Sequence, residues 1–206
     1  MGETLRISVI TSSRELAERT MPMADNSLFF GAIPFDIHKH GRRLHEWCNK
    51  AYSARFWDMQ GSFEELMTYF QERENQQNIT CMLITVNDEP VAFAECYPII
   101  GSELEEHIPE AGPTDYGFHF LMAPPRDLTQ KFPLDKKLIP RWAVMTLLGF
   151  CFTNRNVENM YGEPDMENEK ALKLADRIGF EQLKEIQLSD KKAVLIRYKK
   201  EKYPKF

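Results

Sequence analysis

Hydrophobic side chains alternate with polar ones, or run together in β-branched clusters, at several points along the chain, and these patterns predict β-strands. Residues 5–10 and 28–33 are the first two, and the polar segment between them is expected to be an irregular linker. Residues 81–86 and 91–97 flank the turn-forming sequence Asn-Asp-Glu, which predicts an antiparallel hairpin. Further strands are predicted at residues 116–122, 157–162, 182–188 and 192–198.

Apolar positions three to four residues apart predict helices between these strands. Residues 39–52 place their apolar side chains on one helical face. The next helix is expected to begin at Ser62, where Glu65 completes a capping box. Two more helices are predicted at residues 138–152 and 167–178. Gly179 is expected to end the last of them in a left-handed conformation.

The composition fits one domain that spans residues 1–206. The chain is 43% hydrophobic and 12% aromatic, which is enough to close a sizeable core. Its net charge of −5 argues against a nucleic-acid binder that relies on the phosphate backbone. Because no apolar run approaches the ~18 residues of a membrane span and no signal-peptide pattern is present, we expect a soluble, cytoplasmic protein without membrane partners.

Neither the cysteines nor the histidines form a metal-binding pattern, so no metal is expected. The thiols lie far apart in apolar stretches without a CxxC pair, which predicts reduced, packed side chains. These cysteines are Cys48, Cys81, Cys96 and Cys151. Three histidines, His38, His40 and His45, lie close in sequence, but no carboxylate or thiol completes a convincing set.

Two titratable residues stand at predicted strand ends, where α/β proteins tend to place their chemistry. His119 follows Gly117 by two residues, so the glycine is expected to clear space beside the imidazole for a ligand. Asp165 follows a proline, where it is either a helix cap or a catalytic carboxylate. The glutamate-rich segment 99–114 is expected to be an exposed loop, either merely solvated or lining a cleft that attracts cations.

The order of strands and helices from residue 116 onward, following a hairpin sheet, resembles the acyl-CoA-dependent N-acyltransferase superfamily, or GNAT fold. Asn168, Ala171 and Gly179–Phe180 match the superfamily's Asn-x-x-Ala and Gly-Phe positions. The resemblance implies a mixed α/β (α+β) fold with a mostly antiparallel twisted central sheet and helices on both faces. The fourth and fifth strands, here 116–122 and 157–162, would splay apart to admit the thioester of acetyl-CoA or another acyl-CoA.

A narrower set of motifs is similar to those of the siderophore-biosynthesis acyltransferases. In chain order they are Leu44-x-x-Trp47, Phe56–Trp57, Glu95-x-Tyr97, Asp115-x-Gly117-x-His119 and Glu163–Pro164–Asp165-x-x-Asn168. That family acylates the hydroxylamine nitrogen of N-hydroxylysine or of a hydroxylated diamine, giving the hydroxamate that later chelates iron. The aminoglycoside 6′-N-acetyltransferases share the Leu-x-x-Trp opening and remain an alternative.

The resemblance also implies roles for individual residues. Asp165 would be the general base or orienting acceptor, and His119 would hold the N-hydroxyl group or shuttle the proton. Backbone N–H groups of the 116–122 strand would stabilise the oxyanion. The residues expected beside the cofactor are Phe120, Leu121, Met122 and Asn168. Those expected at the acceptor are Trp47, Trp57, Glu95, Tyr97 and Asp115.

The chain departs from the superfamily pattern at two places. The turn that holds the CoA pyrophosphate is glycine-rich in the superfamily, but residues 131–141 contain no glycine. The phosphates are therefore expected on the basic side chains of Arg126, Lys136, Lys137 and Arg141. Ala175 stands where many members carry a tyrosine that protonates the leaving thiolate, so His119 or water would supply that proton.

Three functions remain open at this point. The first is an N-hydroxyamine acyltransferase that works by direct transfer in a ternary complex, as a monomer or homodimer. The second is an aminoglycoside or polyamine N-acetyltransferase, whose acceptor is an ordinary amine. The third is a non-catalytic module of the same fold, which the glycine-free phosphate turn favours.

Overall fold

A single nine-stranded sheet forms the centre of the described part of the chain. The computed structural model describes residues 5–12, 15–21, 28–57, 59–74, 79–132, 138–154 and 156–204. The strand order is β2-β1-β3-β4-β5-β6-β7-β9-β8. The strands are β1 (Leu5–Ser12), β2 (Glu15–Met21), β3 (Phe29–Pro34), β4 (Thr80–Val86), β5 (Glu89–Pro98), β6 (Asp115–Met122), β7 (Asn159–Gly162), β8 (Glu181–Gln187) and β9 (Lys192–Lys199). The β1–β3 and β6–β7 pairs are parallel, and the other neighbours are antiparallel.

All eight strand predictions are confirmed to within a few residues, but the prediction of an irregular linker between the first two strands was wrong. Glu15–Met21 forms β2, which pairs with β1 and makes the outer edge of the sheet. An edge strand is held by backbone hydrogen bonds to one neighbour and tolerates polar side chains, so hydrophobic alternation does not reveal it.

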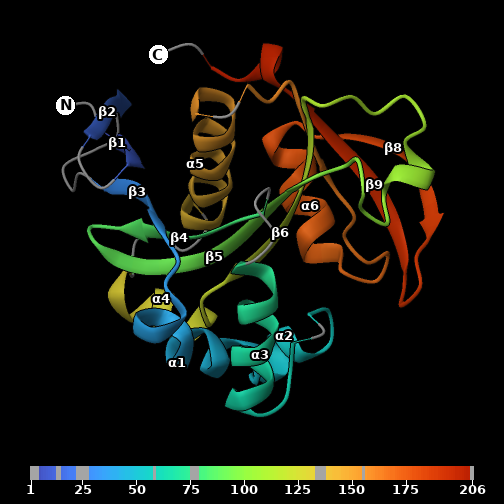
Figure 1. Ribbon diagram of the computed structural model, residues 1–206. Helices are drawn as coiled ribbons and strands as arrows, with labels where there is room; N and C mark the ends of the chain where they lie inside the picture. The colour runs from blue at the N-terminus through green and yellow to red at the C-terminus, as the bar shows by residue number, and fades with distance from the viewer. Residues whose placement is uncertain are drawn as a thin grey trace.

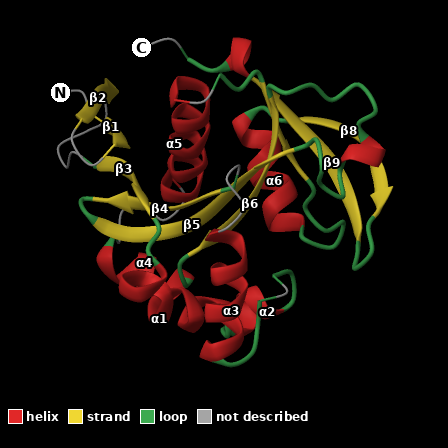
Figure 2. Cartoon of the chain, viewed as in Figure 1, coloured by secondary structure: helices red, strands yellow, loops and turns green. Residues whose placement is uncertain are grey.

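Helices cover both faces of the sheet, as expected (Figures 1 and 2). In the view of Figure 1, α1 to α4 gather below the β4–β5 hairpin, and α5 and α6 lie above it. The α-helices are α1 (Ile37–Cys48), α2 (Ala51–Ala54), α3 (Phe63–Glu74), α4 (Pro125–Lys131), α5 (Leu138–Asn154) and α6 (Glu169–Ile178). Two short 3-10 helices lie at Glu105–His107 and Lys200–Lys202.

The predicted helix 39–52 divides into α1 and α2, and α4 was not predicted. Strand β6 ends shortly before Pro124 and Pro125. Pro125 occupies the first position of α4, where its fixed φ favours a helix and its missing N–H has no cost.

The helix caps agree with the sequence. The Ser62 backbone N–H donates to Oε2 of Glu65 (2.6 Å), and the Glu65 N–H donates to the Ser62 hydroxyl (3.2 Å), which is a complete capping box. The side chain of Asn168 caps α6 by accepting from the N–H of Ala171. Gly179 ends α6 at φ 103°, the left-handed conformation that was expected.

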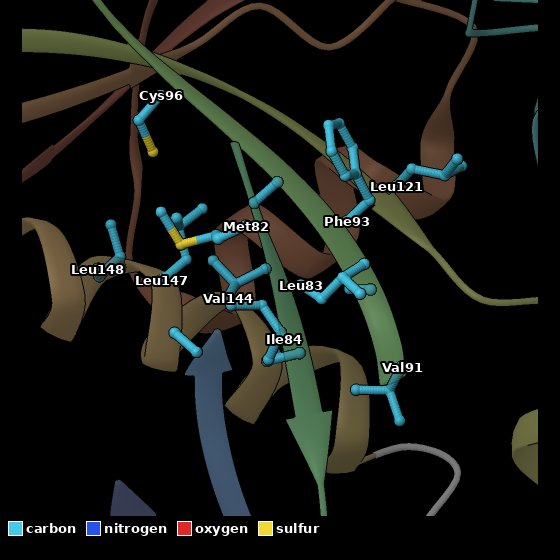
Figure 3. Close-up of a cluster of buried hydrophobic side chains, with 14 of the residues drawn as sticks. Met82, Leu83, Ile84, Val91, Phe93, Cys96, Leu121, Val144, Leu147 and Leu148 are labelled. Carbon is cyan, nitrogen blue, oxygen red and sulfur yellow. The ribbon is translucent and has the colours of Figure 1, made fainter. Parts of the chain in front are cut away.

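Period-two alternation on the central strands separates two buried layers (Figure 3). Met82 and Ile84 point toward α5, where Val144, Leu147 and Leu148 meet them. Leu83, Phe93 and Leu121 are register partners across β4, β5 and β6 and so occupy the opposite face, where the Phe93 ring contacts Phe35 and Phe70. This second layer leads directly to the polar site described below.

The expected splay between two central strands is confirmed, and it lies between β6 and β7. Their parallel ladder joins Asp115, Tyr116 and Gly117 to residues 159–161 and goes no further. Strand β6 continues to Met122 and stays paired with β5 throughout. The β7-facing edge of residues 118–122 therefore has no strand partner in the described part of the chain. No helix among the described residues is long and apolar enough to cross a membrane.

Candidate active site

A polar cleft of about 670 Å³ opens beside the splayed strands, and His119 lies on its wall. The 100–104 loop and the 188–191 turn form its rim. Its inner wall carries Arg73, Glu95, Tyr97, His119 and Glu163. Of the two alternatives for the glutamate-rich loop, solvated only or lining a cleft, the structure supports the second, because Glu103 is both exposed and part of the rim.

The strand register places His119 in the cleft. His119 lies opposite Glu95 in the β5–β6 ladder, and the neighbouring pair on the same face is Phe93 with Leu121. On this face of the sheet, the apolar pair Phe93–Leu121 belongs to the aromatic core, and the next pair, Glu95–His119, is polar. The His119 side chain remains 37% exposed, so a ligand in the cleft can contact it, whereas Glu95 is 1% exposed.

Glu163 is the carboxylate that contacts His119. It follows β7 directly, and its Oε1 lies 3.2 Å from Nε2 of His119. Glu95 lies on the other side of the ring, with Oε1 4.0 Å from Nδ1. The imidazole is thus placed between two buried carboxylates. Our sequence analysis named Glu163 only as part of a motif, because nothing local distinguishes its direction from that of Asp165.

The pKa values of the two groups move in opposite directions. Burial lowers the pKa of His119, but the hydrogen bond to Glu163 and the charges of Glu163 and Glu95 outweigh burial and raise it above 6.5. Burial raises the pKa of Glu163, but the hydrogen bond from His119 and the charges of His119 and Lys191 outweigh it and lower the pKa below 4.5. Between about pH 4.5 and 6.5, His119 and Glu163 therefore form an imidazolium–carboxylate pair.

Gly117 makes room for a side chain of the protein itself. A Cβ at this position would lie 2.5 Å from Cζ and 2.8 Å from the hydroxyl oxygen of Tyr97, its register partner. The space that we expected to hold a ligand thus holds the Tyr97 ring. That ring lies 4.9 Å from the His119 ring, and its hydroxyl donates to Oε2 of Glu163 at 3.4 Å. Tyr97, which was predicted to lie at the acceptor, is therefore in contact with both titrating residues.

Helix α3 fixes Glu95 from the other side. The Tyr69 hydroxyl donates to Oε2 of Glu95 at 3.1 Å, and Nη1 of Arg73 lies 3.1 Å from Oε1. Our sequence analysis identified neither Tyr69 nor Arg73. Their spacing of four residues on an amphipathic helix marks a shared face, but the strand that this face meets is decided by packing.

The other predicted acceptor residues occupy three different environments. The Trp57 ring lies edge-on to the His119 ring at 6.1 Å, and its buried Nε1 has no hydrogen-bond partner among the described residues. Trp47 is buried in the core and borders a separate cavity of about 210 Å³. Asp115 is buried and accepts hydrogen bonds from the Gly112 N–H and the Asn159 amide, which connects β6 to its neighbours.

Asp165 lies in the turn that leads to α6. Its Oδ1 accepts a hydrogen bond from the Glu167 N–H at 2.6 Å, and it is not among the described residues that line the cleft. The structure therefore brings Glu163 and His119 together, while Asp165 lies two residues further along the chain.

Residues 36–188 match the family model described as the acetyltransferase (GNAT) domain. The chain belongs to this family. Membership makes the domain an acyl-CoA-dependent N-acetyltransferase, and the nine-stranded sheet with its splayed strands agrees with the GNAT fold.

Two curated proteins and a solved structure are similar to this GNAT domain. A Schizosaccharomyces pombe protein named "Putative lysine N-acyltransferase" is 25% identical over 75% of this chain, which spans 44% of that relative's length. The aminoglycoside N(6')-acetyltransferase type 1 of Klebsiella pneumoniae is 25% identical over 73% of this chain and 74% of its own. The structure of an aminoglycoside acetyltransferase AAC(6')-Ib with coenzyme A and kanamycin has a TM-score of 0.71, at 20% identity, over 84% of this chain and 95% of its own.

Five of the residues expected at the acyl-CoA co-substrate lie among the described residues near the open edge of β6, on α4 and on α5. The open edge of β6 presents the backbone of Phe120, Leu121 and Met122, where the Met122 carbonyl accepts from the Tyr52 hydroxyl. Arg126 on α4 and Arg141 on α5 are both exposed. The other two phosphate candidates, Lys136 and Lys137, lie outside the described residues.

The thiols are unsuited to a covalent acyl-enzyme. None of the four cysteines forms a disulfide with another described residue, and burial raises the pKa of both Cys48 and Cys81 to about 12. Since the thiolate is the nucleophile, these groups are inert near neutral pH. Within the described residues, no group of three or more His, Cys, Asp or Glu side chains is placed to hold a metal ion.

Proposed function

We propose that this GNAT domain acylates the hydroxylamine nitrogen of an N-hydroxylated lysine or diamine, the hydroxamate-forming step of siderophore biosynthesis. The observation that supports this function is the placement of His119 between Glu95 and Glu163. The two carboxylates raise the pKa of the imidazole, and the carboxylate that contacts it has a lowered pKa.

Such a pair is poorly suited to an ordinary amine. A lysine-like ammonium has a pKa of about 10.4 and must lose a proton before its nitrogen can attack. Neither an imidazolium nor a weakly basic carboxylate drives that loss efficiently. An N-alkylhydroxylamine has a lower pKa and is largely neutral at cellular pH, so it needs orientation and a late proton acceptor. His119 and Glu163 provide both.

Each residue of the site has a separate role in the direct transfer of the acyl group. Acyl-CoA supplies the activated acyl group when bound. His119 donates a hydrogen bond to the hydroxyl oxygen of the acceptor, and Glu163 accepts the proton released as the new nitrogen–carbon bond forms. The carbon–sulfur bond of the thioester breaks, and the CoA thiolate leaves with a proton from His119 or water. Backbone N–H groups on the open edge of β6 stabilise the oxyanion, each contributing roughly 3 kcal/mol where such donors have been measured. The resemblance also implies an acceptor-orienting role for Asp165, although its side chain lies in the turn after Glu163 and outside the described lining of the cleft.

Glu95 is proposed to attract the distal ammonium of the acceptor. It is buried at the inner wall of the cleft, where its Oε1 forms an ion pair with Arg73 at 3.1 Å but accepts no well-aligned hydrogen bond among the described residues. The rim adds Glu103 and Asp190, which favour a cationic acceptor as it enters.

A second candidate function, aminoglycoside or polyamine N-acetylation, is favoured by the same acidic rim. It also agrees with the similarity to the aminoglycoside acetyltransferase of Klebsiella pneumoniae. The pH dependence separates the two, because an amine acceptor makes the rate rise steeply with pH, whereas a hydroxylamine leaves it nearly flat above neutrality.

The decisive experiment follows thiol release from acetyl-, succinyl- and decanoyl-CoA. The acceptors are N-hydroxylysine, N-hydroxycadaverine, N-hydroxyputrescine, spermidine and kanamycin, and the His119→Ala variant is the control. We expect turnover with at least one hydroxylamine at a kcat/KM above that of every amine. A preference for kanamycin or spermidine supports the second candidate, and no heat of CoA binding in calorimetry supports a non-catalytic module.

A further inference from the structure

Five charged side chains of alternating sign follow one another across the cleft. Nη1 of Arg73 lies 3.1 Å from Oε1 of Glu95, which lies 4.0 Å from Nδ1 of His119. Nε2 of His119 lies 3.2 Å from Oε1 of Glu163, and that oxygen lies 3.6 Å from Nζ of Lys191. The proposed function uses the three inner residues and leaves the outer cations, Arg73 and Lys191, without a role.

The two ends of this series are held differently. Glu95 is fixed by two groups of α3, the Tyr69 hydroxyl and the Arg73 guanidinium, and the guanidinium also stacks 4.3 Å from the centre of the Tyr69 ring. The Glu163 carboxylate has longer contacts, 3.4 Å from the Tyr97 hydroxyl and 3.6 Å from the Lys191 ammonium. The position of Glu163 therefore depends more on its cationic partner than that of Glu95 does.

Lys191 belongs to the turn between β8 and β9, which is also part of the cleft rim. The backbone of the turn is closed by a hydrogen bond from the Leu188 N–H to the Lys191 carbonyl at 2.9 Å. The neighbouring Ser189 N–H donates to Oε1 of Glu103 on the opposite rim at 2.7 Å. The side chain of Lys191 is 22% exposed and reaches from this turn to Glu163.

We propose that Lys191 is a positioning residue for acyl transfer: it holds the Glu163 carboxylate against His119 and joins that pair to the rim of the acceptor cleft. The inference rests on the proposed function in one respect, namely that His119 and Glu163 perform the proton transfers. The charged and titratable groups that face this pair are Arg73 on α3, Glu95 and Tyr97 on β5, and Lys191 on the β8–β9 turn.

The test compares Lys191→Met with Lys191→Arg and with Lys192→Met. The last variant removes the same charge from the adjacent exposed residue at the start of β9. We expect Lys191→Met to lower kcat on the order of tenfold, with the KM for acyl-CoA and acceptor changed less than about twofold. Lys191→Arg is expected to restore kcat, and Lys192→Met to leave it unchanged.

A second readout needs no acceptor and so is independent of the proposed substrate. NMR titration follows the His119 ring among the five histidines, with its signals assigned by their loss in His119→Gln. Glu163→Gln is expected to lower the titration midpoint of His119, and this effect should shrink in a Lys191→Met background but not in a Lys192→Met background. An undiminished effect of Glu163→Gln in the Lys191→Met background would overturn the proposal. A change in acceptor KM alone would do the same, since it would make Lys191 a substrate contact.

Discussion

Nε2 of His119 lies 3.2 Å from Oε1 of Glu163, and this contact joins the middle of the sheet to the end of a strand far along the chain. We expect Glu163→Gln to lower kcat by about 100-fold, because the amide cannot accept the proton and no longer balances the imidazolium. Thiol release measures the loss. Glu110→Gln is the matched control, since Glu110 is exposed and lies outside the lining of the cleft, and activity within about threefold of wild type is expected for it.

Asp165→Asn tests the carboxylate that the sequence favoured. We expect kcat to fall on the order of 100-fold if the carboxylate has the role that the resemblance implies. The titration of His119 should stay as in the wild type, because Asp165 lies in the turn and not against the imidazole. Full activity combined with a loss of stability would show that this carboxylate serves only the turn before α6.

The stability of the fold is expected to depend on pH through the same pair. The pKa of His119 is raised in the folded state, so its contribution is fully present below about 6.5 and is lost as the pH rises through the folded value. The pKa of Glu163 is lowered, so its contribution is present above 4.5 and is lost as the pH falls through the folded value.

The stabilisation by this pair is therefore largest between about pH 4.5 and 6.5. Urea unfolding of the wild type and Glu163→Gln at pH 5.5 and at pH 9 measures it, and the difference between the two proteins should be larger at pH 5.5. A difference that is equal at both pH values would contradict the ion pair.

Gly117→Ala is expected to displace the Tyr97 ring and to lower kcat by roughly tenfold to 100-fold. The added methyl group would occupy space that Tyr97 fills, and Tyr97 contacts both His119 and Glu163. Gly112→Ala is the matched control, because the nearest atom to its new Cβ is 3.9 Å away. Equal activity of the two variants would show that the Tyr97 ring has no effect on the site.

Ser62→Ala is expected to reduce the free energy of unfolding by about 1 kcal/mol, because it removes the side chain that caps α3. Helix α3 also carries Tyr69 and Arg73, which contact Glu95. Fraying of its first turn would therefore change the site only if the whole helix moved. Urea unfolding gives the stability change, and kcat is expected to stay within about twofold of the wild type. A large fall in kcat at unchanged stability would go against this view.

Local patterns were sufficient for most of the secondary structure. Alternation revealed the central strands, the Ser62–Glu65 spacing marked the start of α3, and Gly179 marked the end of α6. Each of these signals depends on residues that are only a few positions apart, so it can be recognised from the sequence. Strand β2 was missed for the opposite reason, since its pairing partner rather than its side-chain pattern makes it a strand.

The sequence by itself determined that His119 would stand on a strand beside a splay, and that an acid would follow the neighbouring strand. It did not decide which acid, because Glu163 and Asp165 are separated only by Pro164. Their side chains take different directions only once β7 and the residues that follow it are packed against β9. The tertiary structure also placed Tyr97 in the space beside Gly117 and Lys191 against Glu163. Contacts between distant segments arise from packing, and no local spacing in the chain encodes them.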